Sequence, residues 1–307
     1  MKMNGVLVVG SANMDLVVRT IRFPQPGETV FGDKFGMFPG GKGANQAVAS
    51  AKLGTKTFFV GKMGKDIFRD TLMASMRRDG VDVRHVTFDP RESTGIALIT
   101  VDKDGQNKIA VVSGSNMQLL PRDIDRAKPL FSRVHVVLLQ LEVPVPTVLR
   151  AAQLAKCAGA MVILNPAPAQ ELPAELLNLV DILTPNETEC GILSNTQVED
   201  VDSATRAANQ LLCRGIKHVI VTLGSNGCLL VRKGQARPFP ALRVTPLDTT
   251  GAGDAFNGAL ASALASGKCL DDAVVFANSA AGYSVTRMGA QTSMPTRRRL
   301  QTFLRTC

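Results

Sequence analysis

Residues 248–256 read Asp-Thr-Thr-Gly-Ala-Gly-Asp-Ala-Phe, and an apolar helical pattern follows them at once. Glycines that lead into a helix leave backbone N–H groups free beside the positive end of the helix dipole, an arrangement that binds phosphate or stabilises charge developing on it. Asp254 would stand at the mouth of this helix, either as a catalytic carboxylate or as an ordinary N-cap. Asp248 adds a second polar group that has no obvious capping role. The segment is not a dinucleotide fingerprint, because Phe256 occupies the position of its last glycine.

A second glycine cluster, Gly-Gly-Lys-Gly-Ala-Asn-Gln at residues 40–46, opens a helical pattern that runs to Leu53. Residues 36–42 satisfy G-x-x-x-x-G-K, but Gly43 follows where a P-loop needs a Ser or Thr hydroxyl for magnesium. Backbone without side chains permits the close approach of a small polar ligand, and Asn45 offers a donor and an acceptor to a hydroxyl group. The cluster indicates either a small-ligand site or only a tight turn from strand to helix.

Short apolar runs alternate with helical patterns along most of the chain, which predicts a mainly parallel sheet covered by helices on both faces. The expected strands are 6–9, 57–60, 134–139, 161–164, 181–183 and 218–223, with 227–231 as a hairpin partner. The expected helices are 44–53, 67–79, 145–158, 203–214, 254–264, 271–285 and 296–304. The basic run at 297–299 predicts a solvated helix start.

Two segments interrupt this alternation. Residues 23–38 mix prolines and glycines with strand-forming residues, and the runs 95–101 and 107–112 flank Asp-Lys-Asp-Gly, a good hairpin turn. We expect a small inserted sheet, which is either a lid over the active site or an ordinary surface meander.

Polar residues follow several predicted strands, at the sheet edge where ligands bind in open α/β folds. Asp15 is either a clamp for a sugar diol or a turn residue, and Glu142 ends the run before Pro144. Asn186 and Glu189 either hold magnesium waters or a phosphate, or cap a helix. The polar loop 222–227 suits a nucleotide or a simple hairpin.

Composition limits the classes of protein. The 307 residues contain 35 Lys and Arg against 26 Asp and Glu, a net charge of +9, with 45% hydrophobic residues, which is typical of one globular domain. Three scattered histidines and six dispersed cysteines disfavour a zinc site and a His-based triad and favour a reducing, cytoplasmic setting. The longest apolar stretch is too short to cross a membrane. Without Trp, and with Tyr283 alone, base stacking as in nucleic-acid binders is disfavoured.

Together the two glycine signatures resemble those of the ribokinase-like (phosphofructokinase-B-type) family of carbohydrate kinases. Residues 165–168, 185–189 and 222–224 stand between them in the family's order, so the likeness covers essentially the whole chain. The resemblance implies a three-layer α/β fold in a single domain, 1–307, with lid strands inserted at about 15–38 and 93–113. It also implies a homodimer formed through the β-lid.

The resemblance assigns roles to matching residues. Asp254 would be the catalytic base, with Gly251, Ala252 and Gly253 as the anion hole. The sugar would be held by Asn13, Asp15, Gly41, Lys42, Gly43, Asn45, Glu142 and Asp254. ATP would lie along Asn186, Thr222, Gly224, Ser225, Gly227, Gly253 and Asn278, with Glu189 helping to place Mg²⁺. A K⁺ ion would lie at Asp248, Thr250, Ser284, Arg287, Gly289 and Ser293.

The implied activity is ATP-dependent phosphorylation of D-ribose at its 5-hydroxyl. The alternatives are a kinase for 2-deoxyribose or another small sugar and, from another class, a non-catalytic sugar or nucleotide sensor. The intact Asp254 and glycines disfavour the sensor, and the lack of a long basic tract disfavours a nucleic-acid binder. We expect ATP and a small sugar as partners, with neither nucleic acid nor membrane.

Overall fold

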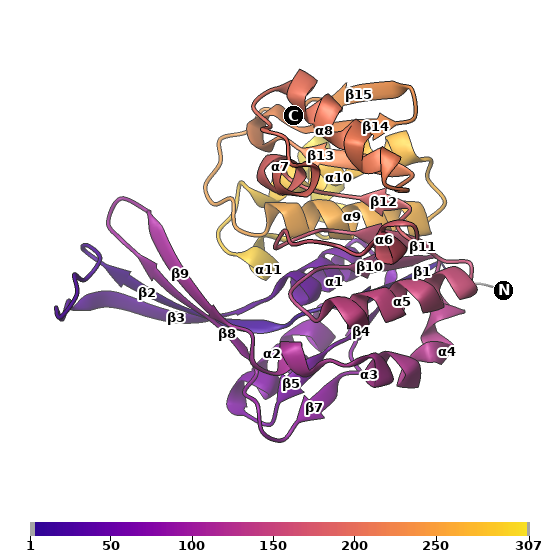
Figure 1. The fold of residues 1–307 in the computed structure, drawn as a ribbon. Coiled ribbons are helices and arrows are strands. Elements are labelled where there is room, and N and C mark those ends of the chain that lie inside the picture. The colour runs from indigo at the N-terminus through magenta and orange to yellow at the C-terminus, as the bar shows by residue number, and fades with distance from the viewer. Residues whose placement is uncertain (1–3, 306–307) are drawn as a thin grey trace.

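A nine-stranded sheet forms the centre of the computed structural model, which describes residues 4–305 (Figure 1). Across the sheet the strands are β15 (Gln235–Phe239), β14 (Cys228–Arg232), β13 (His218–Thr222), β12 (Ile182–Leu183), β11 (Met161–Leu164), β10 (Val136–Leu139), β1 (Gly5–Val9), β4 (Lys56–Val60) and β6 (Val81–Asp82). All neighbours from β6 to β13 pair in parallel, and β14 and β15 are antiparallel. The predicted mainly parallel sheet is confirmed.

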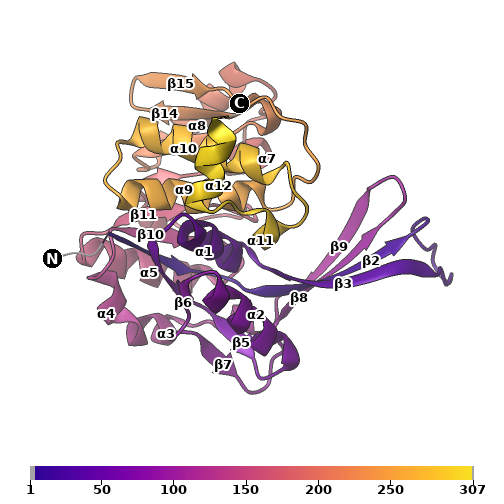
Figure 2. The same ribbon diagram turned by 180° about the vertical axis from the view of Figure 1, so that it is seen from behind.

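Helices cover both faces of the sheet (Figures 1 and 2). Because successive strand side chains point to opposite faces, Val8 of β1 packs in the core beneath one helical layer and Leu7 in the core beneath the other. The first layer contains α1 (Lys42–Lys52), α2 (Ile67–Arg78), α9 (Ala252–Ala265) and α10 (Leu270–Ser284), with α11 (Ala290–Ser293) and α12 (Arg297–Leu304) beside them. The second contains α3 (Pro121–Arg126), α4 (Lys128–Phe131), α5 (Val145–Cys157), α6 (Ala174–Leu177), α7 (Glu187–Ser194) and α8 (Val201–Cys213).

A four-stranded sheet projects from this body, as Figure 1 shows. Its order is β3 (Gly32–Gly40), β2 (Asn13–Thr20), β8 (Gly95–Val101) and β9 (Asn107–Val112). The inserted sheet is confirmed, with two corrections. Asn13 and Asp15 lie within β2 and not in a turn, and residues 23–31 form no strand. Pro24 and Pro26 lack the N–H donors that a strand ladder needs, so pairing resumes only at Gly32.

Several short elements were not predicted. They include β5 (Lys62–Gly64), β7 (Thr87–Asp89), the 3₁₀ helices Gly114–Gln118 and Gly224–Asn226, and the one-turn helices α4, α6 and α11. Within residues 4–305 no helix is long and apolar enough to span a membrane, and no three His, Cys, Asp or Glu side chains group as metal ligands. The five described cysteines are free; Cys307 lies outside the described residues.

Candidate active site

Asp254 lies at the third position of α9, and its side chain is 7% exposed. Its carboxylate accepts hydrogen bonds from Asn45 Nδ2 at 2.9 Å and from Gln46 Nε2 at 3.0 Å. The N-cap position belongs to Gly251, so the interpretation of Asp254 as a helix cap is wrong. Gly251 has φ 74°, and a Cβ there would lie 3.1 Å from Ala290, so the turn requires glycine. The amides of Gly253 and Asp254, in the first helical turn, have no intrahelical acceptor.

Two further glutamines orient the amides that hold Asp254. Gln291 Nε2 donates to Asn45 Oδ1 at 3.1 Å, and Gln140 Nε2 donates to Gln46 Oε1 at 2.5 Å. With each amide oxygen occupied in this way, each NH₂ group faces the carboxylate. No role was expected for Gln46, Gln140 or Gln291 from the sequence. Gln46 belongs to the glycine signature 40–46, and Gln140 is a polar break in an otherwise apolar run.

Burial raises the pKa of Asp254, while the charge of Lys42 and the amides of Asn45 and Gln46 favour the ionised form. For Lys42, burial lowers the pKa, but the carboxylates of Asp254, Glu142 and Glu189 more than compensate and raise it overall. Lys42 is therefore a fixed positive charge beside the buried carboxylate.

A cavity of about 390 Å³ lies between the projecting four-stranded sheet, here called the lid, and the end of β10. Glu142 in its wall accepts from Ser11 Oγ at 2.5 Å and from the backbone amide of Lys42 at 3.1 Å. Asn13 Oδ1 accepts from Asn116 at 2.7 Å, which leaves the NH₂ group of Asn13 to donate elsewhere. The lining is Asn13, Lys42, Val111, Ser113, Asn116, Met117, Leu141, Glu142 and Pro168.

Asp15 lies on β2, close against the first glycine signature. A Cβ at Gly40 would come within 2.3 Å of its carboxylate, so only glycine fits at that position. Burial, reinforced by the charges of Glu142 and Asp254, raises the pKa of Asp15 to about 7. Gly41, which has φ 87°, and Gly43 bring the backbone against the segment after β1.

A second cavity, of about 210 Å³, lies at the glycine turn before α9. Lys42 lines both cavities, so they adjoin at Lys42, and Asp254 lines the second. The lining of the second is Lys42, Asn165, Ala167, Thr184, Asn186, Glu189, Thr222, Thr249, Gly251, Ala252, Gly253, Asp254 and Asn257. The arrangement places the Asp254 carboxylate and helix-start amides in one small hollow, next to a polar pocket.

Asn186 and Glu189 form a reciprocal capping box on α7. The Asn186 side chain accepts from the Glu189 amide at 2.7 Å, and Glu189 accepts from the Asn186 amide at 3.0 Å. The capping interpretation therefore describes their hydrogen bonds, although both residues also line the second cavity. Burial raises the pKa of Glu189.

The remaining expected ATP residues lie farther along this edge. Thr222 ends β13, bridges to Asn186 and lines the second cavity. Gly224, Ser225 and Gly227 belong to the loop that follows and do not line that cavity. Asn278, on α10, does not line it either. Asn278 Nδ2 donates to the carbonyl of Pro240 at 2.7 Å and so ties α10 to the segment after β15.

The two segments expected to bind potassium, 248–250 and 284–293, are in contact. Asp248 accepts from the Thr250 amide at 2.9 Å and from the Gly289 amide at 2.7 Å. Asp248 thus has a turn-capping role that the sequence did not reveal. Its pKa is lowered because these hydrogen bonds outweigh burial. The hydroxyls of Ser284 and Ser293 donate to carbonyls of their own helices, at Ala281 and Ala290, and Arg287 stacks on Tyr283.

A buried carboxylate beside unpaired helix-start amides suits an enzyme that transfers a phosphoryl group to a small polar molecule. The model of the pfkB family of carbohydrate kinases matches residues 3–297, and the chain belongs to this family. It is 43% identical over 297 residues to the ribokinase of Haemophilus influenzae, covering 97% of each chain. It is 39% identical to the deoxyribokinase of Salmonella typhimurium, covering 94% of this chain and 95% of that one.

Among solved structures, that of Arabidopsis thaliana ribokinase complexed with ribose and ATP superposes with a TM-score of 0.93. It is 36% identical, with 99% of each chain covered. The expected three-layer fold with a small lid sheet and the expected carbohydrate-kinase class are confirmed.

Proposed function

We propose that the protein transfers the γ-phosphoryl group of ATP to the 5-hydroxyl of D-ribose. The single observation that carries this is Asp254, a buried carboxylate that is held by two amides and lines the glycine-turn hollow, with Lys42 between this hollow and the polar pocket. The choice of substrates is supported by the likeness to the Haemophilus ribokinase over nearly the full length of both chains, and by the ribose and ATP in the Arabidopsis complex.

In this reaction Asp254 accepts the proton of the primary hydroxyl as its oxygen attacks the γ-phosphorus. The bond from oxygen to phosphorus forms, the bond from the γ-phosphorus to the bridging oxygen breaks, and its electron pair leaves on ADP. The turn Gly251-Ala252-Gly253 would form the anion hole, in which the unpaired amide of Gly253 donates to the phosphoryl oxygens, while the Ala252 amide already donates to the Thr249 carbonyl at 3.2 Å and so shapes the turn. Lys42 adds a fixed positive charge. Positioning and electrostatics suffice here because phosphoryl transfer needs little covalent help.

Sugar hydroxyls would bind in the lid-side cavity. Asp15 and Glu142 accept from hydroxyls, and the free NH₂ of Asn13 donates to one. A site with this many polar groups disfavours a sugar that lacks a hydroxyl, because its partner would be left unpaired. A 2-deoxyribose kinase is the second candidate, favoured by the likeness to the Salmonella deoxyribokinase.

Two cations fit the site. Mg²⁺ takes carboxylate and phosphate oxygens, and Glu189 faces the second cavity, so Glu189 would help to place a magnesium ion that neutralises the phosphates of ATP. K⁺ takes carbonyl and hydroxyl oxygens. The hydroxyls of Ser284 and Ser293 donate to carbonyls and keep their lone pairs, and Asp248 holds the facing segment. A potassium ion there would fix the shape and field of the anion-hole turn.

The lid supports a homodimer. Its outward side chains are apolar and exposed, including Phe35 at 65% and Leu98 at 50%, and contiguous apolar surface of this kind marks interaction sites. Sedimentation should give a dimer for the wild-type protein and a monomer for Leu98→Lys; a wild-type monomer would refute this part. We also place the protein in the cytoplasm, as its free cysteines support.

The test of function is ADP release with ATP, Mg²⁺ and K⁺, measured across ribose, 2-deoxyribose, fructose and nucleosides. We expect ribose to give the highest kcat/KM. Preference for 2-deoxyribose would transfer the assignment to the second candidate, and turnover with none of these acceptors would overturn it.

A further inference from the structure

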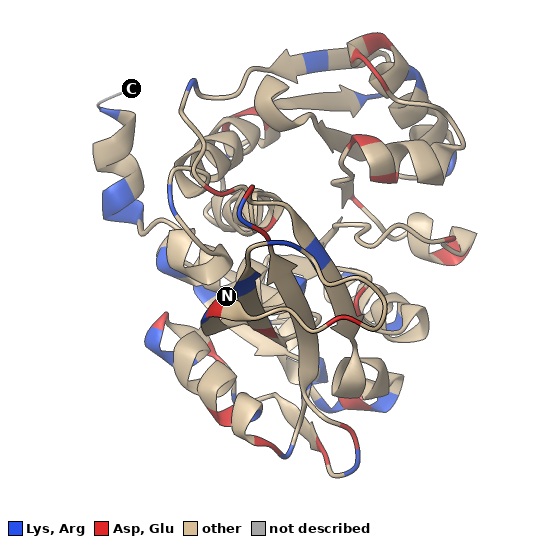
Figure 3. Ribbon diagram, turned by 90° about the vertical axis from the view of Figure 1, so that its left-hand side faces the viewer, with Lys and Arg blue, Asp and Glu red and all other residues tan. Residues whose placement is uncertain are grey.

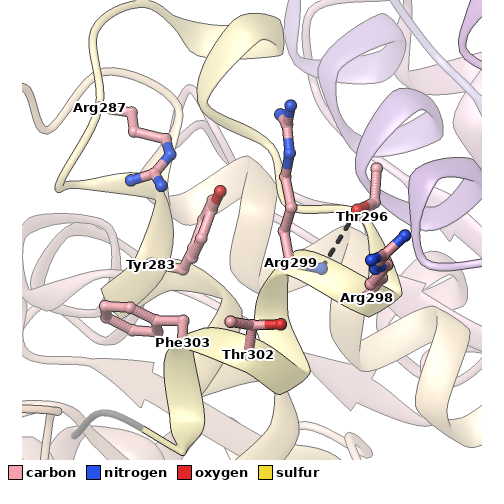
Figure 4. Close-up of a pocket in the computed structure, with 7 residues that line it drawn as sticks. All are labelled: Tyr283, Arg287, Thr296, Arg298, Arg299, Thr302 and Phe303. Atoms are coloured by element: carbon pink, nitrogen blue, oxygen red, sulfur yellow. Dashed lines mark hydrogen bonds between the residues drawn. The ribbon is translucent and has the colours of Figure 1, made fainter.

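A hollow of about 670 Å³ lies between the end of α10 and helix α12, apart from the active site (Figure 4). It shares no lining residue with either active-site cavity. Its polar lining consists of the three guanidinium groups of Arg287, Arg298 and Arg299 and the hydroxyls of Tyr283, Thr296 and Thr302. No carboxylate belongs to this lining, so the pocket presents donors and positive charge.

The positive charge is not compensated by the protein. In Figure 3 the first turn of α12, on the helix that leads to the C label, carries Lys or Arg colour. Arg298 and Arg299 lie in that turn, which contains no acidic residue, although positive charge is unfavourable at this end of a helix dipole. Within residues 4–305 none of the three arginines has a carboxylate partner. Arg287 instead stacks on the Tyr283 ring, 4.2 Å from its centroid.

The hydroxyl of Tyr283 is a second, independent sign of a ligand. The side chain is 2% exposed, and its hydroxyl has no hydrogen-bond partner among the described residues. A buried hydroxyl usually has a partner, because leaving it unpaired costs its lost hydration. In Figure 4 it points into the pocket, between the guanidinium groups of Arg287 and Arg299. An anion drawn between these two groups would also accept a hydrogen bond from Tyr283.

We propose that this pocket binds a phosphate monoester. Guanidinium groups match phosphate oxygens in paired hydrogen bonds, and the start of α12 adds backbone donors. The rings of Tyr283 and Phe303 pack edge to face, with their centroids 5.3 Å apart, and form an apolar wall for the organic part of the ester. The volume falls in the range of roughly 300–1,000 Å³ that is usual for small-molecule sites. Binding here is independent of the proposed activity.

The chain offers a site-specific probe, because it contains one Tyr and no Trp. Intrinsic tyrosine fluorescence therefore comes from Tyr283, in the wall of this pocket. The full-length protein is titrated with inorganic phosphate and with ribose 5-phosphate, with NaCl holding the ionic strength constant. We expect a saturable fluorescence change with both ligands, tighter for the ester, and none with chloride or with ribose.

Arg299→Gln should weaken binding by about tenfold, the usual contribution of a charged hydrogen bond, and Arg298→Gln should weaken it less, because Arg298 lies farther from Tyr283 (Figure 4). Arg297→Gln is the matched control, because Arg297 is exposed on the same turn but does not line the pocket. Line broadening in the ³¹P spectrum of phosphate gives a second measurement that does not depend on Tyr283.

Three outcomes would overturn the proposal. A response that follows ionic strength without saturating would mean general screening. Equal weakening in Arg297→Gln would mean that only surface charge matters. An unchanged response in the Arg298→Gln, Arg299→Gln double variant would place the anion elsewhere in the protein.

Discussion

Replacing Gln291 by Met tests whether the outer glutamines keep the carboxylate of Asp254, the proposed base, ionised. Met has similar length and no donor, so Asn45 Oδ1 would lose its hydrogen bond at 3.1 Å. The Asn45 amide could then rotate and turn its oxygen toward Asp254, which it now approaches with Nδ2 at 2.9 Å. Two acceptors facing each other would raise the pKa of Asp254, because the ionised form loses a donor.

The magnitude follows from the bond at stake. A hydrogen bond to a charged group contributes roughly 1.5–3 kcal/mol, and one pKa unit corresponds to about 1.4 kcal/mol. The lower end applies, because the released Asn45 can still adopt its present orientation, so we expect a shift of about one unit. A base with a raised pKa is ionised only at higher pH. The acid limb of kcat should therefore move upward by about one pH unit, with little change in KM for the sugar.

The assay is a pH profile of kcat and KM for Gln291→Met, with Thr292→Val as the control. Thr292 is exposed on the same short helix and bonds only to the Met288 carbonyl, so its loss disturbs α11 without touching Asn45. Gln140→Met should shift the limb in the same direction through Gln46. An unmoved acid limb in Gln291→Met, or the same shift in Thr292→Val, would refute the orienting role.

Four other predictions follow from the site and the fold. Asp254→Asn should lower kcat by about 10²- to 10⁴-fold with ATP affinity unchanged, and near-normal turnover would remove it as the base. Replacing K⁺ by Na⁺ should lower the rate, and equal rates in the two salts would count against the cation site. Because the pKa of Asp15 is about 7, KM for the sugar should fall as pH rises through that value, and Asp15→Asn should abolish this dependence. For Asp181, hydrogen bonds from Lys156 and Lys217 outweigh burial and lower its pKa, so its contribution to stability is present above about pH 4 and is lost as pH falls. Urea unfolding should therefore separate Asp181→Asn from wild type at pH 7, and the difference should shrink at pH 3.

The sequence predicted the long, strongly patterned elements because each carries its own signal. The strand at Met161–Leu164 is a continuous apolar run, as expected of a strand buried on both faces, and the helix at Ile67–Arg78 has its apolar residues at helical spacing. The sequence did not predict the bounds of strands that depend on pairing with distant strands. β2 begins at Asn13 because Asn13 lies between Gly40 of β3 and Gly95 of β8, residues far away in the chain.

The same dependence on distant segments explains why only part of the site could be predicted. Both glycine signatures and Asp254 were visible as local patterns, but the two amides that hold Asp254 and the two glutamines that orient them come from three separate segments of the chain. Gln291 is 246 residues from Asn45, and Gln140 is 94 residues from Gln46. A lone glutamine in an apolar run has no local reason to be polar. Only the fold shows that its NH₂ group occupies the oxygen of a second amide and so decides which end of that amide meets the base.

The distribution of charge differs between the two proposed anion sites. Lys42 is the one Lys or Arg that lines the two active-site cavities within the described residues, so phosphate there would meet chiefly backbone amides and cations. Backbone donors have a fixed direction and can match a transferring phosphoryl group, which needs positioning more than affinity. The pocket at α12 instead uses guanidinium groups at the ends of long side chains, which bind phosphate through paired hydrogen bonds but do not hold it beside a carboxylate for transfer. Neutralising Arg298 and Arg299 should therefore leave kcat at saturating ATP and sugar unchanged in the absence of phosphate ligands, whereas neutralising Lys42 should lower it.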